Sequence, residues 1–263
     1  WALLEMPAIQ ARMRYLHAQV QQPVNVNEIL RESFPFAHVV LTGSGQAAES
    51  CLFRAMPKKG VVPQNLLFPS TIFHQIDNGF EPLELPHPSV FDVRSPDTRK
   101  AEMNLEALEA EVSRKGAAIA CVCIEVGNNA SGGHPVSARH LRDVKALLGR
   151  HAIPLVVDAT RAIQNARLLV DRREEPAVEG LWNVVRELSS CADVLIGSLT
   201  KEHCVNRGGI VACDDPALFA RLRDVLDRES AGLDVIDRKL IALSLANRPY
   251  IESRVGRKIE QAQ

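Results

Sequence analysis

The chain has 263 residues, of which 46% are hydrophobic and 24% charged, and its formal net charge at pH 7 is −1. This balance is typical of a water-soluble globular protein. It gives no electrostatic basis for binding nucleic acid or an anionic membrane surface, and no apolar run is long enough to span a bilayer. We therefore expect a cytoplasmic protein whose partners include neither nucleic acid nor membrane.

Apolar strand patterns and amphipathic helix patterns alternate along the chain. In chain order they predict a strand at 38–42, a helix at 46–56, strands at 65–68 and 81–85, a helix at 104–116, a strand at 117–126, a helix that Ser137 caps and that runs to about 151, a strand at 154–158, a helix from about 159, a helix at 176–190, strands at 193–198 and 208–213, and helices at 216–229 and over most of 235–262. An antiparallel direction is considered for 208–213.

Strands that are apolar throughout and separated by helices predict an α/β fold with a mostly parallel sheet and helices on both faces. We divide the chain into an N-terminal arm with connecting helices (1–37), a large cofactor-binding α/β domain (38–235) and a helix (236–263) that we expect to lead toward a small C-terminal domain absent from this sequence. Both ends of the sequence look cut. The loops that leave the carboxyl ends of the strands should form the binding crevice.

The cysteines are expected to be buried reduced thiols rather than disulfide partners. Cys121 and Cys123 lie two residues apart in a predicted strand. We expect them to face opposite sides of it, which disfavours a shared metal ion relative to packing in the core.

The segment TGSGQAAE at 42–49 follows a predicted strand and opens a helix, in the outline of a dinucleotide-binding motif. That motif also needs an acidic residue at the end of the second strand, and the second predicted strand ends without one. A nicotinamide or flavin site is therefore disfavoured. A glycine turn that enters a helix can still bind a phosphate group through free backbone N–H groups.

Two charged residues stand at the ends of predicted strands. Asp158 ends LVVD, and Lys201 follows VLIGSLT. Asp158 alone could simply cap the next helix. Together, the two suit pyridoxal phosphate, because a lysine amine forms a Schiff base with the cofactor aldehyde and a carboxylate keeps the pyridine nitrogen protonated. Phe68 could stack on the ring. We expect a partly buried, apolar setting to lower the pKa of Lys201.

Several segments in the same order resemble the tryptophanase and tyrosine phenol-lyase family of β-eliminating lyases: FPSTIFHQIDNG (68–79), NNASGGHPVS (128–137), LVVDATR (155–161) and SLTKEHCVNRGG (198–209). The resemblance implies the large domain of a fold-type I pyridoxal phosphate enzyme, the fold of aspartate aminotransferase. It also implies a homodimer or homotetramer and a small amino-acid substrate.

The resemblance implies three catalytic residues. Lys201 would form the aldimine with pyridoxal 5′-phosphate, Asp158 would pair with the ring nitrogen, and Tyr15 would be the tyrosine supplied by the neighbouring subunit. Asn206 would match a residue whose carbonyl binds a monovalent cation such as K⁺. The other cofactor-binding residues would stack on the ring, approach its 3-hydroxyl or surround the phosphate: Ser44, Gly45, Gln46, Glu49, Phe68, Asn129, Arg161 and Ser198.

The chain departs from the family pattern at several positions, among them Ile72 in place of an arginine. Gln46 replaces an arginine and Thr200 replaces the first of two adjacent lysines, so two cationic phosphate contacts are missing unless Arg207 compensates. Pro69 replaces the residue that helps to recognise the leaving ring. We therefore expect β-elimination of a Cβ substituent by way of Lys201. β-Replacement, retro-aldol cleavage and a non-catalytic role as an assembly partner remain alternatives, and the fragment alone is expected to be inactive.

Overall fold

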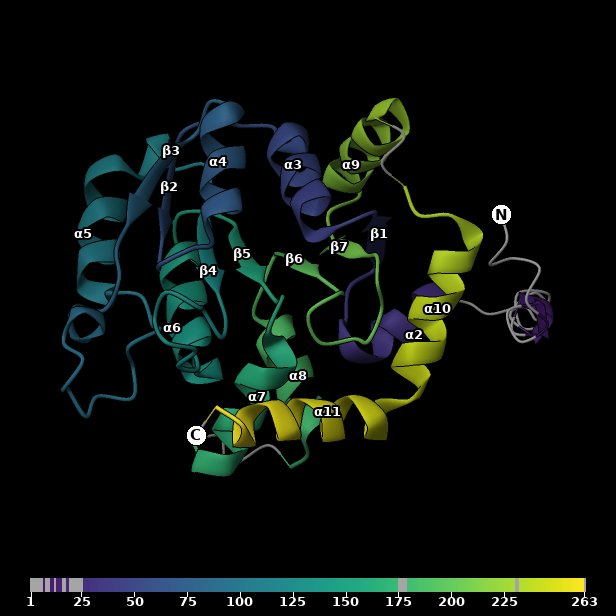
Figure 1. The fold of residues 1–263 in the computed structure, drawn as a ribbon. Helices are drawn as coiled ribbons and strands as arrows, with labels where there is room; N and C mark the ends of the chain where they lie inside the picture. Colours follow the sequence, from purple (N-terminus) through teal and green to yellow (C-terminus); the bar gives the residue numbers. More distant parts are fainter. Residues whose placement is uncertain are drawn as a thin grey trace.

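The computed structural model describes residues 26–174, 179–229 and 232–262, together with positions 7, 10, 11, 13–15 and 18. Over these residues a seven-stranded sheet has helices on both faces (Figure 1), which confirms the predicted α/β class. The strand order is β1-β7-β6-β5-β4-β2-β3. The strands are β1 (His38–Thr42), β2 (Val61–Gln64), β3 (Glu81–Glu84), β4 (Val122–Glu125), β5 (Leu155–Asp158), β6 (Val194–Ser198) and β7 (Gly209–Cys213).

Strand direction determines where the loops meet. β3, β2, β4, β5 and β6 are parallel neighbours, whereas β7 pairs antiparallel with both β6 and β1. The antiparallel direction considered for 208–213 is therefore confirmed. Because β7 is antiparallel to both of its neighbours, β1 runs parallel to β6. The carboxyl ends of β1, β4, β5 and β6 consequently lie at the same edge of the sheet, as the crevice rule requires.

Helices form a layer on each face of the sheet (Figure 1). One layer consists of α3 (Gly45–Ala55), α4 (Pro69–Asp77) and α9 (Pro216–Glu229), and the other of α6 (Ala138–Gly149), α7 (Ala162–Arg172) and α8 (Leu181–Ser190). Around the second layer lie α2 (Val26–Ser33), α10 (Val235–Ala246) and α11 (Arg248–Glu260). α5 (Leu105–Lys115) lies near β3, and the chain has short 3-10 turns at Pro88–Phe91 and Gly116–Ala118. Each face buries its own apolar cluster.

Local capping explains several helix starts. The Ser137 hydroxyl accepts a hydrogen bond from the His140 N–H at 3.1 Å, which confirms the predicted cap of α6. The Ser44 hydroxyl caps α3 in the same way through the Ala47 N–H, also at 3.1 Å. Each cap satisfies one of the N–H groups that the first turn of a helix leaves without a partner.

Several predicted elements differ from the structure. The second strand is 61–64 rather than 65–68, and the residues after it lead into α4, which was not predicted. Pro63 weakens the strand pattern because it lacks an N–H, and Pro69 in the first turn of α4 is a helix-start signal that was missed. β4 covers only 122–125 of the predicted 117–126. The C-terminal helix is two helices, because Asn247 ends α10 and Pro249 lies in the first turn of α11.

The cysteines are free thiols, and all but the half-buried Cys204 are buried. The expectation that Cys121 and Cys123 face opposite sides was wrong. Residues two apart in an extended strand point to the same face, and their sulfur atoms lie 4.0 Å apart. No group of three or more His, Cys, Asp or Glu side chains in the described residues could hold a metal ion. No described helix is both long and apolar enough to cross a membrane.

Candidate active site

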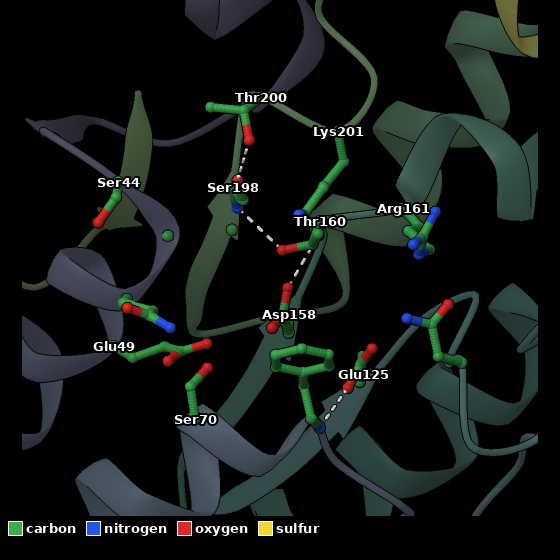
Figure 2. A pocket seen from close by; sticks show the side chains of 15 residues that line it. Ser44, Glu49, Ser70, Glu125, Asp158, Thr160, Arg161, Ser198, Thr200 and Lys201 are labelled. Atoms are coloured by element: carbon green, nitrogen blue, oxygen red, sulfur yellow. Dashed lines mark hydrogen bonds between the residues drawn. The ribbon is translucent and has the colours of Figure 1, made fainter. Parts of the chain in front are cut away.

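A cavity of about 250 Å³ opens at the carboxyl edge of the sheet (Figure 2). The structure brings together around it all ten residues predicted to bind the cofactor. It also adds Ser70, Glu125, Thr160, Gly197 and Thr200. The lining residues are Ser44, Gly45, Gln46, Glu49, Phe68, Ser70, Glu125, Asn129, Asp158, Thr160, Arg161, Gly197, Ser198, Thr200 and Lys201.

Asp158 is the last residue of β5 and is only 6% exposed. Its Oδ1 accepts a hydrogen bond from the Thr160 N–H at 2.8 Å. Burial raises the pKa of the Asp158 carboxyl, while the hydrogen bonds from Thr160 and the charge of Arg161 oppose that rise. The capping alternative is excluded, because α7 begins at Ala162 with Arg161 as its N-cap. The Thr160 N–H holds one oxygen of the Asp158 carboxyl, and the carboxyl lines the cavity, where it can contact a ligand.

The loop after β6 carries the lysine. The Ser198 N–H donates to the Thr160 hydroxyl at 2.8 Å, and the hydroxyls of Ser198 and Thr200 lie 3.0 Å apart. These contacts join the loops that follow β5 and β6. Lys201 is solvent-exposed in this structure, so the expectation of a partly buried side chain was wrong. Figure 2 shows its side chain directed toward Thr160 and Asp158.

The start of α3 forms the opposite wall of the cavity. A Cβ atom on Gly45 would lie 2.7 Å from the Ser198 Cβ, and one on Gly209 would lie 2.1 Å from the Ser44 carbonyl oxygen. Only glycine therefore allows the α3 turn, β6 and β7 to approach this closely. The first turn of α3 has no acidic residue, so its free N–H groups and the positive end of the helix dipole can bind a phosphate.

These residues fit pyridoxal phosphate in their chemistry. A lysine amine and a buried carboxylate share one cavity, and a glycine turn at a helix start provides a cradle for a phosphate. An aromatic side chain, Phe68, lies at the wall with 45% of its surface exposed and can cover a ring. The poorest part of the fit is the charge at the phosphate end, where Gln46 and Thr200 are neutral and Glu49 is acidic.

Glu49 lies on α3, is 7% exposed and accepts a hydrogen bond from the Thr71 hydroxyl at 3.0 Å. Its other carboxyl oxygen, Oε2, is buried and makes no hydrogen bond of normal geometry. Burial is the main cause that raises the pKa of Glu49 to about 7, and the charge of Asp158 adds to the effect. Near neutral pH the folded chain therefore favours the protonated form of the Glu49 carboxyl group.

We expect the cofactor-free protein to lose stability as the pH rises from about 5 to about 7. The folded-state pKa of Glu49, about 7, lies above its ordinary value of 4.5, so in this window the folded state keeps a proton that the unfolded state has released. The shift corresponds to roughly 3 kcal/mol of unfolding free energy. Urea unfolding of Glu49→Gln at pH 5 and pH 8 should show a smaller change than wild type.

Glu106→Gln provides the matched control, because Glu106 is an exposed carboxyl on α5. Its unfolding free energy should depend on pH as that of the wild type does. An unchanged pH dependence in Glu49→Gln would show that the folded state does not hold a proton on Glu49.

Among the lining residues that the sequence did not predict, Glu125 matters most for the chemistry of the site. It ends β4 as Asp158 ends β5, and the two are paired in register. Burial and the charge of Asp158 raise the pKa of Glu125 to about 8, against the hydrogen bond from the Phe68 backbone and the charge of Arg161. The available signal was an acidic residue at the end of an otherwise apolar strand, VCIE.

Three other residues of interest lie outside the cavity lining. Arg207 pairs with Asp237 at 3.2 Å instead of supplying charge to the phosphate end. Asn206 is exposed on the same loop. Tyr15 is 54% exposed and is not part of the cavity wall. The roles given to Tyr15 and to a cation at Asn206 stay predictions.

Comparison with known proteins supports the resemblance. Residues 5–262 match the profile of the family described as "Beta-eliminating lyase". Tyrosine phenol-lyase of Clostridium tetani is 33% identical over 199 residues, which cover 75% of this chain and 43% of that protein. Tryptophanase of Salinibacter ruber is 32% identical over 242 residues, which cover 87% of this chain and 50% of that protein. The chain thus spans half or less of these curated relatives.

Solved structures share the fold. Threonine aldolase of Leishmania major aligns with a TM-score of 0.65 at 14% identity, covering 89% of this chain and 66% of that one. A methionine gamma lyase of Micromonospora echinospora aligns with a TM-score of 0.56 at 20% identity, covering 81% and 49%. Tyrosine phenol-lyase and tryptophanase are pyridoxal phosphate-dependent, which confirms the expected class of cofactor for the family. With its profile matched across nearly the whole sequence, the chain belongs to the beta-eliminating lyase family.

Proposed function

We propose that this chain is the cofactor-binding part of a pyridoxal phosphate-dependent lyase that eliminates a Cβ substituent from an amino acid. The observation that carries the proposal is the shared cavity of Lys201 and Asp158, beside the glycine turn that opens α3. An amine and a buried carboxylate from neighbouring strand ends are the two groups that this cofactor needs from a protein.

Each wall of the cavity would have one task. When bound, the cofactor supplies an electron sink for negative charge that develops at the substrate Cα atom. Lys201 would anchor the cofactor and then accept the proton from Cα, and Asp158 would hold a proton at the ring nitrogen. Ser44 and Ser198 would bind the phosphate together with the N–H groups of α3, and Phe68 would cover the ring.

The substrate class is narrowed by Pro69. It replaces the residue that helps family members recognise an aromatic leaving group, its side chain has no donor or acceptor, and it does not line the cavity. This favours a small amino acid over tyrosine or tryptophan. The same observation supports β-replacement or retro-aldol cleavage as a second candidate reaction on the same cofactor.

The remaining expectations go with this proposal. In a homodimer or homotetramer, Tyr15 would act in the cavity of the neighbouring subunit. The protein would work in the cytoplasm, and a monovalent cation such as K⁺ would bind near Asn206. A non-catalytic assembly role is the competing proposal, which the neutral side chains at Gln46 and Thr200 support.

Covalent labelling tests the proposal. The natural full-length protein, incubated with pyridoxal phosphate, should develop visible absorption, and borohydride reduction followed by mass mapping should place the label on Lys201. Release of pyruvate from serine, or from a cysteine conjugate, would identify β-elimination. Release of an aldehyde from a β-hydroxy amino acid would identify retro-aldol cleavage. Labelling of Lys201 with no turnover of any of these would favour the assembly role, and no label at Lys201 would refute the cofactor assignment.

A further inference from the structure

The feature that the proposed function leaves unexplained is a second buried acid beside Asp158. Glu125 and Asp158 are the last residues of two adjacent parallel strands and face each other in register. They are 4% and 6% exposed, and both line the cavity (Figure 2). Cofactor binding at Asp158 needs one carboxylate there, so the second acid calls for a separate explanation.

The Glu125 carboxyl group holds the residue that would cover the cofactor ring. Its Oε2 accepts a hydrogen bond from the Phe68 N–H at 2.7 Å, and Figure 2 draws this contact. Phe68 is the N-cap of α4, and its own side chain makes no capping hydrogen bond. Glu125 therefore ties the first residue of α4 to the end of β4.

The backbone of Glu125 is itself fixed. The Asn65 side chain accepts a hydrogen bond from the Glu125 N–H at 3.0 Å and donates one to the Glu125 carbonyl at 3.0 Å. Its amide also donates to the Ala101 carbonyl at 2.9 Å. Asn65 is 1% exposed. This clamp fixes the Glu125 backbone, and the bond to the Phe68 N–H holds the end of its side chain, as a positioning task requires.

The charges around Glu125 decide its ionisation. Asp158 on β5 and Glu49 on α3 are acidic, and Arg161 at the start of α7 and Lys201 after β6 are the cationic side chains that line the cavity. Two adjacent buried carboxyls do not both ionise readily. Each of the two acids accepts one backbone N–H, and the charge of Arg161 opposes the rise in the pKa of both. In the proposed function the ring nitrogen of the cofactor would pair with Asp158 and favour its charged form, which leaves Glu125 as the member of the pair that would keep the proton.

We propose that Glu125 is a positioning residue for the cofactor ring, anchoring the Phe68 backbone through a protonated carboxyl group and leaving Asp158 as the carboxylate that pairs with the ring nitrogen. The proposal rests on the proposed function, because it concerns the same cofactor. It assigns Glu125 no proton transfer to substrate. Its role is to fix one wall of the cavity without adding a second negative charge beside Asp158.

Two variants of Glu125 separate anchoring from charge. Glu125→Gln keeps an oxygen that can accept from the Phe68 N–H and has the shape of the protonated acid. Glu125→Met keeps the approximate volume and leaves that N–H without its acceptor. The affinity of the full-length protein for pyridoxal phosphate, measured from visible absorption, should stay within about threefold of wild type for Gln. It should fall roughly ten- to a hundredfold for Met, because the residue that would cover the cofactor ring loses the acceptor that fixes its backbone.

Infrared difference spectroscopy reports the proton directly. The loaded wild-type protein at slightly acidic pH should show a C=O stretching band of protonated carboxyl groups, and the Glu125 component of this band should be absent in Glu125→Gln. The matched control is Glu49→Gln, which removes another buried carboxyl of the same cavity and leaves the Phe68 anchor in place. The Glu125 component of the band should persist in this control and fade as the pH rises.

The outcomes are distinguishable. If Glu125→Met binds pyridoxal phosphate as tightly as the wild-type protein does, the anchoring role is overturned. A carboxyl band that is unchanged in Glu125→Gln would overturn the assignment of the proton. Failure of the wild-type protein itself to bind pyridoxal phosphate would overturn the proposed function and, with it, the role of Glu125. A normal thermal unfolding curve for Glu125→Gln keeps the infrared comparison valid whether or not Glu125→Met folds.

Discussion

The Lys201→Ala variant is expected to lose all borohydride-dependent labelling and to slow lyase turnover by about 10² to 10⁴. Alanine removes the amine that anchors the cofactor and the base that would take the proton from Cα. The neighbouring contacts among Ser198, Thr160 and Thr200 do not involve the lysine side chain, so the loop should keep its conformation. Mass mapping after reduction and turnover with the best substrate of the panel measure both losses.

Lys258→Ala is the matched control for this variant. Lys258 lies on α11 and lines a neighbouring cavity together with Lys201. Burial is the main cause that lowers the pKa of Lys258, and the charge of Arg161 adds to the effect, so it is a plausible competitor for the aldehyde. The control should label and turn over as wild type does. Labelling of Lys258 in the Lys201→Ala protein, with turnover retained, would show that Lys258 rather than Lys201 anchors the cofactor.

Restoring two cations at the phosphate end should strengthen cofactor binding. The double variant Gln46→Arg/Thr200→Lys is expected to bind pyridoxal phosphate roughly ten- to a thousandfold more tightly, because a charge-assisted hydrogen bond is worth about 1.5–3 kcal/mol against about 1 for a neutral one. Gln46 and Thr200 both line the cavity. An arginine at position 46 would also lie one helical turn before Glu49 and lower the pKa of that carboxyl.

The effect should depend on charge rather than on side-chain length. A Gln46→Met/Thr200→Met protein has side chains of comparable reach without charge, and its affinity should not exceed that of wild type. Titrations at two salt concentrations add a second criterion, because only the charged variant should lose affinity as screening increases. An affinity of the Arg/Lys protein equal to that of wild type would mean that the phosphate binds elsewhere.

Sequence patterns predicted the sheet well where strands are apolar and short-range signals agree. The strands that end at Asp158 and Ser198 were placed almost to the residue. The second strand was misplaced because Pro63 interrupts its pattern, while the apolar run Leu66–Phe68 belongs to the loop before α4. Strand neighbours are set by long-range pairing, so the position of β7 between β1 and β6 could not be read from local periodicity.

Site residues were predictable from the sequence where the residue type itself suggests a reaction. Asp158 ends one strand and Lys201 follows another, and although Asp158 alone could have capped a helix, the two together suit one cofactor. Glu125 escaped notice because an acidic residue at the end of a strand is ordinary, and only the register with Asp158 gives it significance. Thr160 was likewise invisible, since its hydroxyl matters only through the Ser198 N–H.

The antiparallel insertion of β7 has a consequence for the order of assembly. β1 is the edge strand and pairs only with β7 among the described strands, so residues 38–42 wait for residues 209–213 before they join the sheet. Pairing across such a distance in sequence is slow to form. During synthesis the first turn of α3 therefore gains its place beside Ser198 and Gly209 only after residues 209–213 have been made.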